Sequence, residues 1–325
     1  MKNVSNSTAL KDIKVIDLFA GIGGFHLAFK SFGADVIYAS EWDKDAADVY
    51  FDNFGITPTG DITKISADDI PDHDVLCAGF PCQAFSISGN QKGFDDSRGT
   101  LFFDVARIVK KKKPRLVFME NVKNFASHDN GRTLSVVKKT MEELGYSFFY
   151  DVLNAADYGV PQSRNRIYML AFRDDLGVTK FTFPKPIPLE KIVKNVLLPK
   201  EITGKYEIIR NDVIMKQITE KKSTSPLRLG IVNKGGQGER IYSVLGTAIT
   251  LSAYGGGVGA KTGIYLVDNK LRRLAPRECA RLTGFPEGYK IAASDNIAYK
   301  QFGNSVVVDV LQFIIEEIIN IGGVF

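Results

Sequence analysis

A strand, a glycine turn and a helix near the N-terminus constrain the fold more than any other feature of this sequence. Residues 14–19 (KVIDLF) form an apolar run typical of a buried strand, and residues 20–24 (AGIGG) lead into a helix expected over 25–32. Glycines let the backbone approach a ligand closely, and a helix N-terminus offers free N–H groups. The pattern predicts an α/β fold with a nucleotide site. Because the spacing is not the full GxGxxG fingerprint, a tight turn that needs glycine for its conformational freedom is the alternative.

An acidic residue follows each of the next two expected strands. The strand over 35–40 ends at Glu41, about 20 residues after the glycine turn, where folds of this kind bind ribose hydroxyls. Trp42, the only tryptophan, could stack on an adenine, and Asp61, after a third expected strand, could accept a hydrogen bond from the adenine amino group. The alternatives are a surface glutamate and a tryptophan in the core. Together these residues favour a cofactor site at the carboxyl ends of the strands.

A cysteine stands where another expected strand ends. Residues 74–78 read as a short buried strand, Gly79 and Pro81 stop it, and Cys82 opens a polar stretch expected to be a loop. A thiol at the carboxyl end of a strand is a candidate nucleophile. The alternative is a buried cysteine that only packs. Cys82 is favoured over Cys77, which lies inside the strand.

Charged residues on two later strands could complete such a site. Glu120 follows the apolar run 115–119, so we expect it at the same sheet edge as Cys82, as a candidate acid. Arg164 and Arg166 precede the expected strand 167–172 and, being two residues apart, would share one face of it. They could hold a carbonyl or a phosphate. A surface acid and exposed arginines without a specific role are the alternatives.

Composition narrows the class of protein. The three cysteines (77, 82 and 279) contain no CxxC pair and are odd in number, which argues against a disulfide framework or a zinc site and fits a reducing cytoplasm. The first residues are polar, and no run of about 18 apolar residues could cross a membrane. The net charge of +5 permits a polyanionic partner without requiring one. We therefore expect a cytoplasmic protein without a metal or a membrane partner.

The second half of the chain has a different character. Three prolines in 184–188 indicate a linker, and the stretches 235–240 and 252–263 are rich in glycine, which predicts a smaller, mostly β and irregular domain. Such loops suit adaptable contact with nucleic acid, although ordinary flexible loops would look the same. The last helix, expected after 301–305, is apolar enough to return to the first domain. The expected division is a cofactor-binding catalytic domain of 1–188 plus 304–325, a target-recognition domain of 189–275 and a hinge of 276–303.

Six segments spread over nearly the whole chain form a specific combination: DLFAGIGG from Asp17, GFPCQAFS from Gly79, ENV from Glu120, QSRNRIY from Gln162, RECARLTGFP from Arg277 and QFGNSV from Gln301. In this order they resemble the motifs of the DNA cytosine-5 methyltransferases. The resemblance implies an α/β, Rossmann-like S-adenosylmethionine-dependent methyltransferase domain with a smaller, mostly β target-recognition domain. It also implies double-stranded DNA as the partner, S-adenosylhomocysteine as the product, and action as a monomer.

The stretch RLGIVNKGGQGERIYS further resembles the bacterial GCGC-specific members, which belong to restriction-modification systems. A cognate endonuclease would then be a genetic rather than a physical partner. The sequence departs from that pattern at Ser163, Asn165, Val258 and Gly259. The inner cytosine of GCGC is therefore the expected target by resemblance alone.

The resemblance implies three groups of functional residues, none of them metal ligands. The catalytic group comprises Cys82 as nucleophile, Glu120 and Arg166 as the residues that hold the target cytosine, and Arg164 beside them. The cofactor-binding group comprises Phe19, Gly21, Ile22, Gly23, Glu41, Trp42, Asp61, Ile62, Pro81, Leu101, Asn304 and Ser305. The DNA-binding group comprises Ser86, Ser88, Gln237, Arg240, Thr250, Tyr254 and Gly257, with Gln237 and Ser88 filling the gap that a flipped base leaves.

Three other functions are weighed against a DNA methyltransferase. A branch of the family modifies tRNA, but the glycine-rich loops favour duplex DNA. A nicotinamide-dependent oxidoreductase is disfavoured by the incomplete glycine fingerprint and the lack of a partner for hydride transfer. A DNA-binding module without catalysis would leave the Cys82–Glu120 arrangement unexplained.

Overall fold

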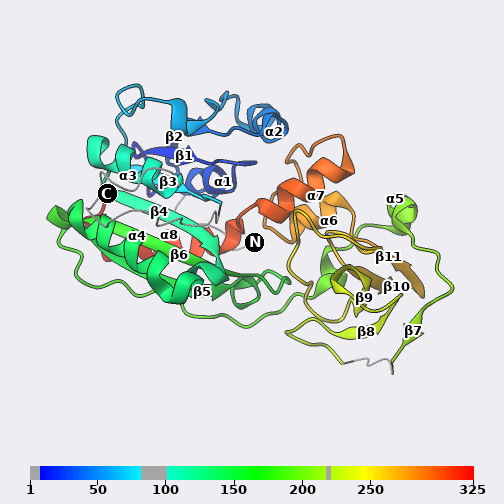
Figure 1. The fold of residues 1–325 in the computed structure, drawn as a ribbon. Helices are drawn as coiled ribbons and strands as arrows, with labels where there is room; N and C mark the ends of the chain where they lie inside the picture. The colour runs from blue at the N-terminus through cyan, green and yellow to red at the C-terminus, as the bar shows by residue number, and fades with distance from the viewer. Residues whose placement is uncertain (1–7, 82–100, 217–220) are drawn as a thin grey trace. The chain divides into compact units, whose positions relative to one another are not determined.

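The described residues divide into two compact units. The computed structural model describes residues 8–81, 101–216 and 221–325. The first unit contains the described residues up to 153 together with 165–184 and 311–325, and the second contains 154–164 and 185–310. Figure 1 shows the elements of both units, coloured along the chain.

The first unit is built on a six-stranded sheet. Its strand order is β2-β1-β3-β4-β6-β5, and β1 pairs with β2 and β3, and β3 with β4, in parallel, whereas β6 runs antiparallel to β4. Both β3 and most of β4 are fully buried. Parallel strands that are buried on both faces need nearly continuous apolar runs, and these two strands have them. The strands are β1 (Lys14–Leu18), β2 (Asp35–Ser40), β3 (Val75–Ala78), β4 (Leu116–Val122), β5 (Tyr146–Asn154) and β6 (Asn165–Arg173).

Helices cover both faces of this sheet. Alternate residues of β1, β3, β4 and β6 pack with α3 (Leu101–Lys112) and α4 (Arg132–Glu143) in one apolar cluster. On the other face, α1 (Gly24–Lys30) contacts Phe118 of β4 through the rings of Phe25 and Phe29, 5.2 and 6.4 Å away. The helix α2 (Lys44–Phe54) follows β2, and α8 spans Val308–Ile321. This is the layered α/β arrangement expected from the sequence.

The second unit contains a smaller sheet with the order β11-β10-β9-β8-β7. Its pairs are antiparallel apart from β9 and β10, which are parallel. Its small core is formed by Leu229, Val232, Ile241 and Ile264. The elements are α5 (Lys200–Thr203), β7 (Ile214–Met215), β8 (Arg228–Ile231), β9 (Arg240–Ser243), β10 (Ile264–Val267), β11 (Lys270–Arg272), α6 (Pro276–Arg281) and α7 (Asp295–Asn304).

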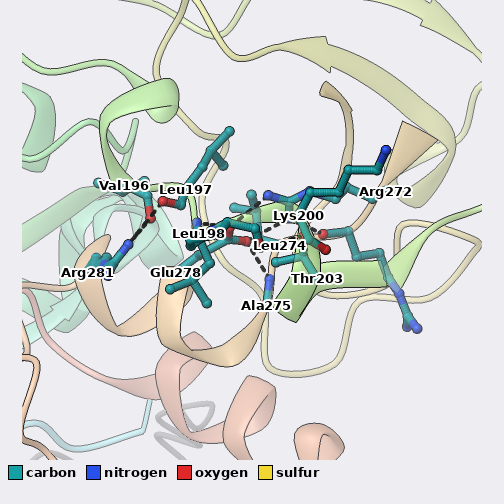
Figure 2. A network of polar contacts seen from close by, with 12 residues as sticks. Val196, Leu197, Leu198, Lys200, Thr203, Arg272, Leu274, Ala275, Glu278 and Arg281 are labelled. Atoms are coloured by element: carbon teal, nitrogen blue, oxygen red, sulfur yellow. Dashed lines mark hydrogen bonds and ion pairs between the residues drawn. The ribbon is translucent and has the colours of Figure 1, made fainter. Parts of the chain in front are cut away.

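A buried carboxylate joins three segments of the second unit (Figure 2). Glu278 on α6 is fully buried and accepts two hydrogen bonds from the guanidinium of Arg272, at 2.8 and 2.7 Å. It also accepts from the backbone N–H groups of Leu198 and Ala275, both at 2.7 Å. Because every acceptor is used, this buried charge is compensated, and it fixes α6 against β11 and the segment before α5.

Two local expectations are corrected by the structure. The third strand before Asp61 is reduced to a single bridge between Thr59 and Ser40, and Asp61 instead caps a short 3-10 helix, η1 (Ile62–Lys64). The last helix, α8, does follow 301–305 as expected, but residues 301–304 form the end of α7, so Ser305 is the C-terminal cap of α7 rather than a cap of α8. Contact clustering places 276–303 and 154–164 in the same unit as the recognition sheet, and the functional division into a catalytic domain, a recognition domain and a hinge stays a prediction.

Candidate active site

The glycine turn is held by a carboxylate from the next strand. Gly21 and Gly23 have positive φ angles of 53° and 80°, and a Cβ atom on Gly23 would overlap the ring of Phe54, so only glycine fits there. Glu41 accepts hydrogen bonds from the backbone N–H of Gly21 and of Asp43, each at 2.8 Å. Burial raises the pKa of Glu41. The turn and the end of β2 therefore form one preorganised backbone unit.

Two of the expected cofactor residues, Trp42 and Asp61, lie beside this unit. Trp42 is 81% exposed, so the alternative of a tryptophan in the core is wrong. Two hydrogen bonds hold the segment just before Asp61 against the end of β2. The Glu41 N–H donates to the carbonyl of Thr59 at 3.0 Å, and the Ser40 hydroxyl donates to the carbonyl of Gly60 at 2.8 Å. Nothing lies within 4 Å of a Cβ atom built on Gly21 or Gly60. An open indole, carboxylates and uncovered glycine backbone suit an adenosine-containing ligand.

Two buried residues that flank the glycine turn in the sequence were not predicted to be functional residues. Asp17 on β1 is 1% exposed, and burial raises its pKa well above the usual range. His26 on α1 lies 2.7 Å from the hydroxyl of Tyr50 through Nδ1 and stacks on Phe54 with ring centroids 3.8 Å apart. Burial lowers the pKa of His26 to about 3, so the ring is neutral at physiological pH. An acid inside an apolar strand was the sequence signal for Asp17.

Replacing Asp17 by asparagine is expected to reduce the loss of stability at high pH. Because burial raises the Asp17 pKa, the folded protein binds this proton more tightly than the unfolded chain does. The corresponding stability is fully present below the unfolded pKa of about 3.9 and is lost as the pH rises through the folded pKa. The melting temperature of Asp17→Asn relative to wild type should therefore increase between pH 5 and pH 8, by about 2 °C or more. Asp52→Asn, on the exposed side of α2, is the control. An equal difference at both pH values would contradict this.

Glu120 and Arg166 form a nearly buried ion pair. Their side chains are 10% and 13% exposed, and Arg166 Nε lies 3.1 Å from Glu120 Oε1. Glu120 pairs with Tyr168 in the antiparallel register of β4 and β6, which places Arg166 diagonally across on the same face. Glu120 belongs to the last three residues of β4, so it lies at the carboxyl end of the strand as expected. The pair presents an acid and a guanidinium side by side.

The ion pair lies against the segment that leads to the expected nucleophile. A Cβ atom built on Gly79 would be 4.0 Å from Glu120 Oε2, and Asn121 Nδ2 donates to the carbonyl of Phe80 at 2.9 Å. Cys82, Ser86 and Ser88 lie outside the described residues. Their placement stays a prediction. Of the described cysteines, Cys77 and Cys279 are both buried, and burial raises their thiol pKa well above the usual range, which disfavours either as a nucleophile.

Arg164 lies elsewhere than expected. It precedes β6, which begins at Asn165, so it does not share a strand face with Arg166. Its side chain is 1% exposed, and its guanidinium donates to the carbonyls of Leu251, Gly303 and Ser305. These carbonyls hold the side chain inside the second unit. A guanidinium used in this way holds backbone segments instead of touching a substrate.

The glycine-rich loops of the second unit are interlocked. A Cβ atom on Gly238 would overlap the carbonyl of Gly256, and Gly259 N–H donates to the carbonyl of Gly238 at 2.7 Å. The expected DNA-binding residues lie on and beside this crossing: Gln237 is exposed, Tyr254 is 80% exposed, and Gly257 has a φ of 81°. The backbone crossing explains why glycines alternate with polar residues here.

Four further expected contact residues lie in the second unit. Arg240 opens β9 and donates through Nε to the carbonyl of Gly235 at 3.3 Å. Thr250 is exposed, with its hydroxyl 2.6 Å from the carbonyl of Ser163. Asn304 is exposed and Ser305 half-buried.

The described residues contain no group of three or more His, Cys, Asp or Glu side chains arranged to hold a metal. None of the helices in the described ranges has the length and apolar character to span a membrane.

The family model for C-5 cytosine-specific DNA methylases matches residues 13–320. The chain belongs to the C-5 cytosine-specific DNA methylase family. The type II methyltransferase M.HhaI of Haemophilus parahaemolyticus is 63% identical over 94% of both chains. The type II methyltransferase M.HaeII of Haemophilus aegyptius is 42% identical over 96% of this chain and 94% of its own length. A solved structure, the S. pombe Dnmt2 methyltransferase, shares the fold, with a TM-score of 0.72, 22% identity and coverage of 93% of this chain and 97% of that chain.

Family membership confirms the central predictions. The chain is a DNA cytosine-5 methyltransferase with the α/β fold of S-adenosylmethionine-dependent methyltransferases, and S-adenosylmethionine is its methyl donor. The exposed Trp42, the Glu41 bridge and the uncovered glycine turn fit such a donor. The individual residue roles stay predictions.

Proposed function

We propose that this enzyme methylates the inner cytosine of GCGC in double-stranded DNA through a covalent adduct with Cys82. The observation that carries the chemistry is the Glu120–Arg166 pair, which lies against Gly79, three residues before Cys82. The 63% identity to a type II modification enzyme supports a role in restriction-modification. The enzyme would act as a monomer in the bacterial cytoplasm, with a cognate endonuclease as a genetic partner.

Each residue of the proposed site has a distinct task. The Cys82 thiolate attacks cytosine carbon 6, which converts the ring to an enamine whose carbon 5 is nucleophilic. Glu120 holds a proton at ring nitrogen 3, and Arg166 donates to the carbonyl oxygen, so both stabilise the charge that develops in the ring. S-adenosylmethionine supplies an electrophilic methyl group. A base then removes the carbon 5 proton, and Cys82 leaves.

The cytosine must leave the duplex for this chemistry, because carbon 6 is inaccessible in a stacked base pair. Flipping costs roughly a few kcal/mol. Gln237 carries both a donor and an acceptor and lies exposed on the interlocked loops, where it could bond the orphaned guanine. Arg240 and Thr250 would supply a guanine contact and a backbone contact.

The target site can be tested directly. Plasmid DNA from cells that express the chain is expected to show methylation at the inner cytosine of GCGC on bisulfite sequencing. The Cys82→Ser variant, expressed at the same level, should show none. Methylation at another sequence would mean that the chain resembles the GCGC-specific enzymes in its chemistry but not in its target site. Methylation of tRNA instead of duplex DNA would overturn the proposed substrate.

Replacing Gln237 by glycine is expected to weaken base flipping more than cofactor binding. The loss of its hydrogen bonds to the orphaned guanine should lower affinity for a GCGC duplex by about tenfold. Binding of S-adenosylhomocysteine in the absence of DNA should change by less than about twofold, because Gln237 lies on a recognition loop and is not one of the expected cofactor contacts. Fluorescence of 2-aminopurine at the target position and calorimetric titration measure the two effects. An equal loss of both would reject the role.

A further inference from the structure

Arg164 joins three backbone segments of the second unit. Its Nη1 donates to the carbonyl of Leu251 at 3.2 Å, and its Nη2 donates to those of Gly303, at 3.0 Å, and Ser305. These acceptors are 87 to 141 positions away in the sequence. The side chain is 1% exposed, so the bonds are formed away from water, where bonds to a charged donor are strongest.

Neighbouring contacts make the same junction rigid. The Gln162 amide accepts from Leu251 N–H at 3.1 Å and donates to the carbonyl of Leu282 at 2.6 Å. The Thr250 hydroxyl donates to the carbonyl of Ser163. A Cβ atom on Gly303 would overlap the backbone at 252–253. The segment around 250 and the end of α7 therefore cannot shift independently without breaking bonds to the 162–164 segment.

The junction lies between two sets of expected ligand contacts. Leu251 directly follows Thr250, the expected contact to the DNA backbone, and Gly303 and Ser305 flank Asn304, an expected cofactor contact. Thr250 and Asn304 are both exposed. One buried guanidinium thus holds the peptide groups that position a DNA-binding side chain and a cofactor-binding side chain.

We propose that Arg164 is a positioning residue that couples cofactor binding to DNA binding. This inference rests on the proposed function, which supplies the roles of Thr250 and Asn304. A ligand that orders either segment also orders the shared guanidinium, so the second ligand meets a site already in place. Such coupling is reciprocal and typically changes affinity by about 5-fold to 150-fold. The planar fork of arginine suits this task, whereas a lysine ammonium is a point donor that cannot reach all three carbonyls in the same geometry.

The matched pair of variants is Arg164→Lys and Arg277→Lys. Arg277 also donates to two carbonyls of the second unit, those of Pro286 and Tyr289, but neither adjoins an expected ligand contact. S-Adenosylhomocysteine is titrated into each full-length protein with and without a GCGC duplex. The ratio of the two dissociation constants measures the coupling, and a melting curve of each variant reports whether it is folded.

In wild type and Arg277→Lys, the duplex should tighten S-adenosylhomocysteine binding by at least about fivefold. In Arg164→Lys the duplex should tighten S-adenosylhomocysteine binding by less than about twofold. An undiminished factor in Arg164→Lys, or no coupling in wild type, overturns the proposal. A wild-type protein that binds neither ligand overturns the proposed function itself and the coupling with it. A merely structural role for Arg164 would weaken each binding step but leave the ratio unchanged.

A second measurement tests the coupling in the wild-type protein, so it applies even if Arg164→Lys does not fold. In wild type, S-adenosylhomocysteine alone should slow amide hydrogen exchange at 248–253, although no expected cofactor contact lies there. Strand β10 (Ile264–Val267) serves as the control segment of the same unit and should not respond. Unchanged exchange at 248–253, or an equal slowing in β10, overturns the coupling.

Discussion

Replacing Glu120 by glutamine is expected to lower the rate of methyl transfer by about 10²–10⁴, the range typical for the loss of a positioned proton donor. Glutamine retains an oxygen that can accept from Arg166 Nε, which lies 3.1 Å from Glu120 Oε1, so the local geometry should survive. What is lost is the exchangeable proton at ring nitrogen 3. The factor corresponds to about 2.7–5.5 kcal/mol of transition-state stabilisation.

Single-turnover transfer of a labelled methyl group to a GCGC duplex measures this effect, with duplex affinity measured alongside. Affinity should change little, since the proton acts on the reacting ring. Glu143→Gln is the matched control: Glu143 lies on α4, pairs with Lys139 at 3.8 Å, and its side chain is 49% exposed. Cys82→Ser gives the level without the proposed nucleophile. A Glu120→Gln rate within tenfold of wild type would remove the carboxyl from the chemistry.

The parallel core of the first unit could be predicted from the sequence because its strands are continuous apolar runs. Residues such as 75–78 and 116–119 are buried on both faces, and their composition leaves little alternative. Glu120 could be placed near Gly79 by the same logic, because adjacent strands bring their carboxyl ends to one edge. These are local patterns whose meaning does not depend on distant residues.

The end of α7 could not be predicted, because a distant side chain sets it. No glycine or proline follows Asn304; Ser305 turns to an extended conformation with a ψ of 156°. Arg164 donates to the carbonyls of Gly303 and Ser305, at the helix end where intrahelical partners run out. A helix end that depends on a residue about 140 positions away leaves no pattern in the sequence around it. The same contact explains why Arg164 was wrongly placed beside Arg166.

Replacing Glu278 by alanine is expected to destabilise the second unit by about 3–5 kcal/mol, because it leaves the buried guanidinium of Arg272 without its carboxylate. The backbone N–H groups of Leu198 and Ala275 also lose their acceptor. The melting temperature should fall by more than about 6 °C. Glu287→Ala is the matched control, since Glu287 pairs with Arg281 of the same helix but is 60% exposed, and such pairs contribute at most about 1 kcal/mol.

A double variant separates the ion pair from the backbone contacts. Once Glu278 is alanine, the further change Arg272→Met removes an uncompensated buried charge, so it should cost little or restore part of the stability. In the wild-type background the same change leaves the Glu278 carboxylate with two backbone donors and should be clearly destabilising. If instead the two losses simply add, the bonds between Arg272 and Glu278 carry no coupling energy. The network in Figure 2 would then hold α6 through the backbone N–H groups alone.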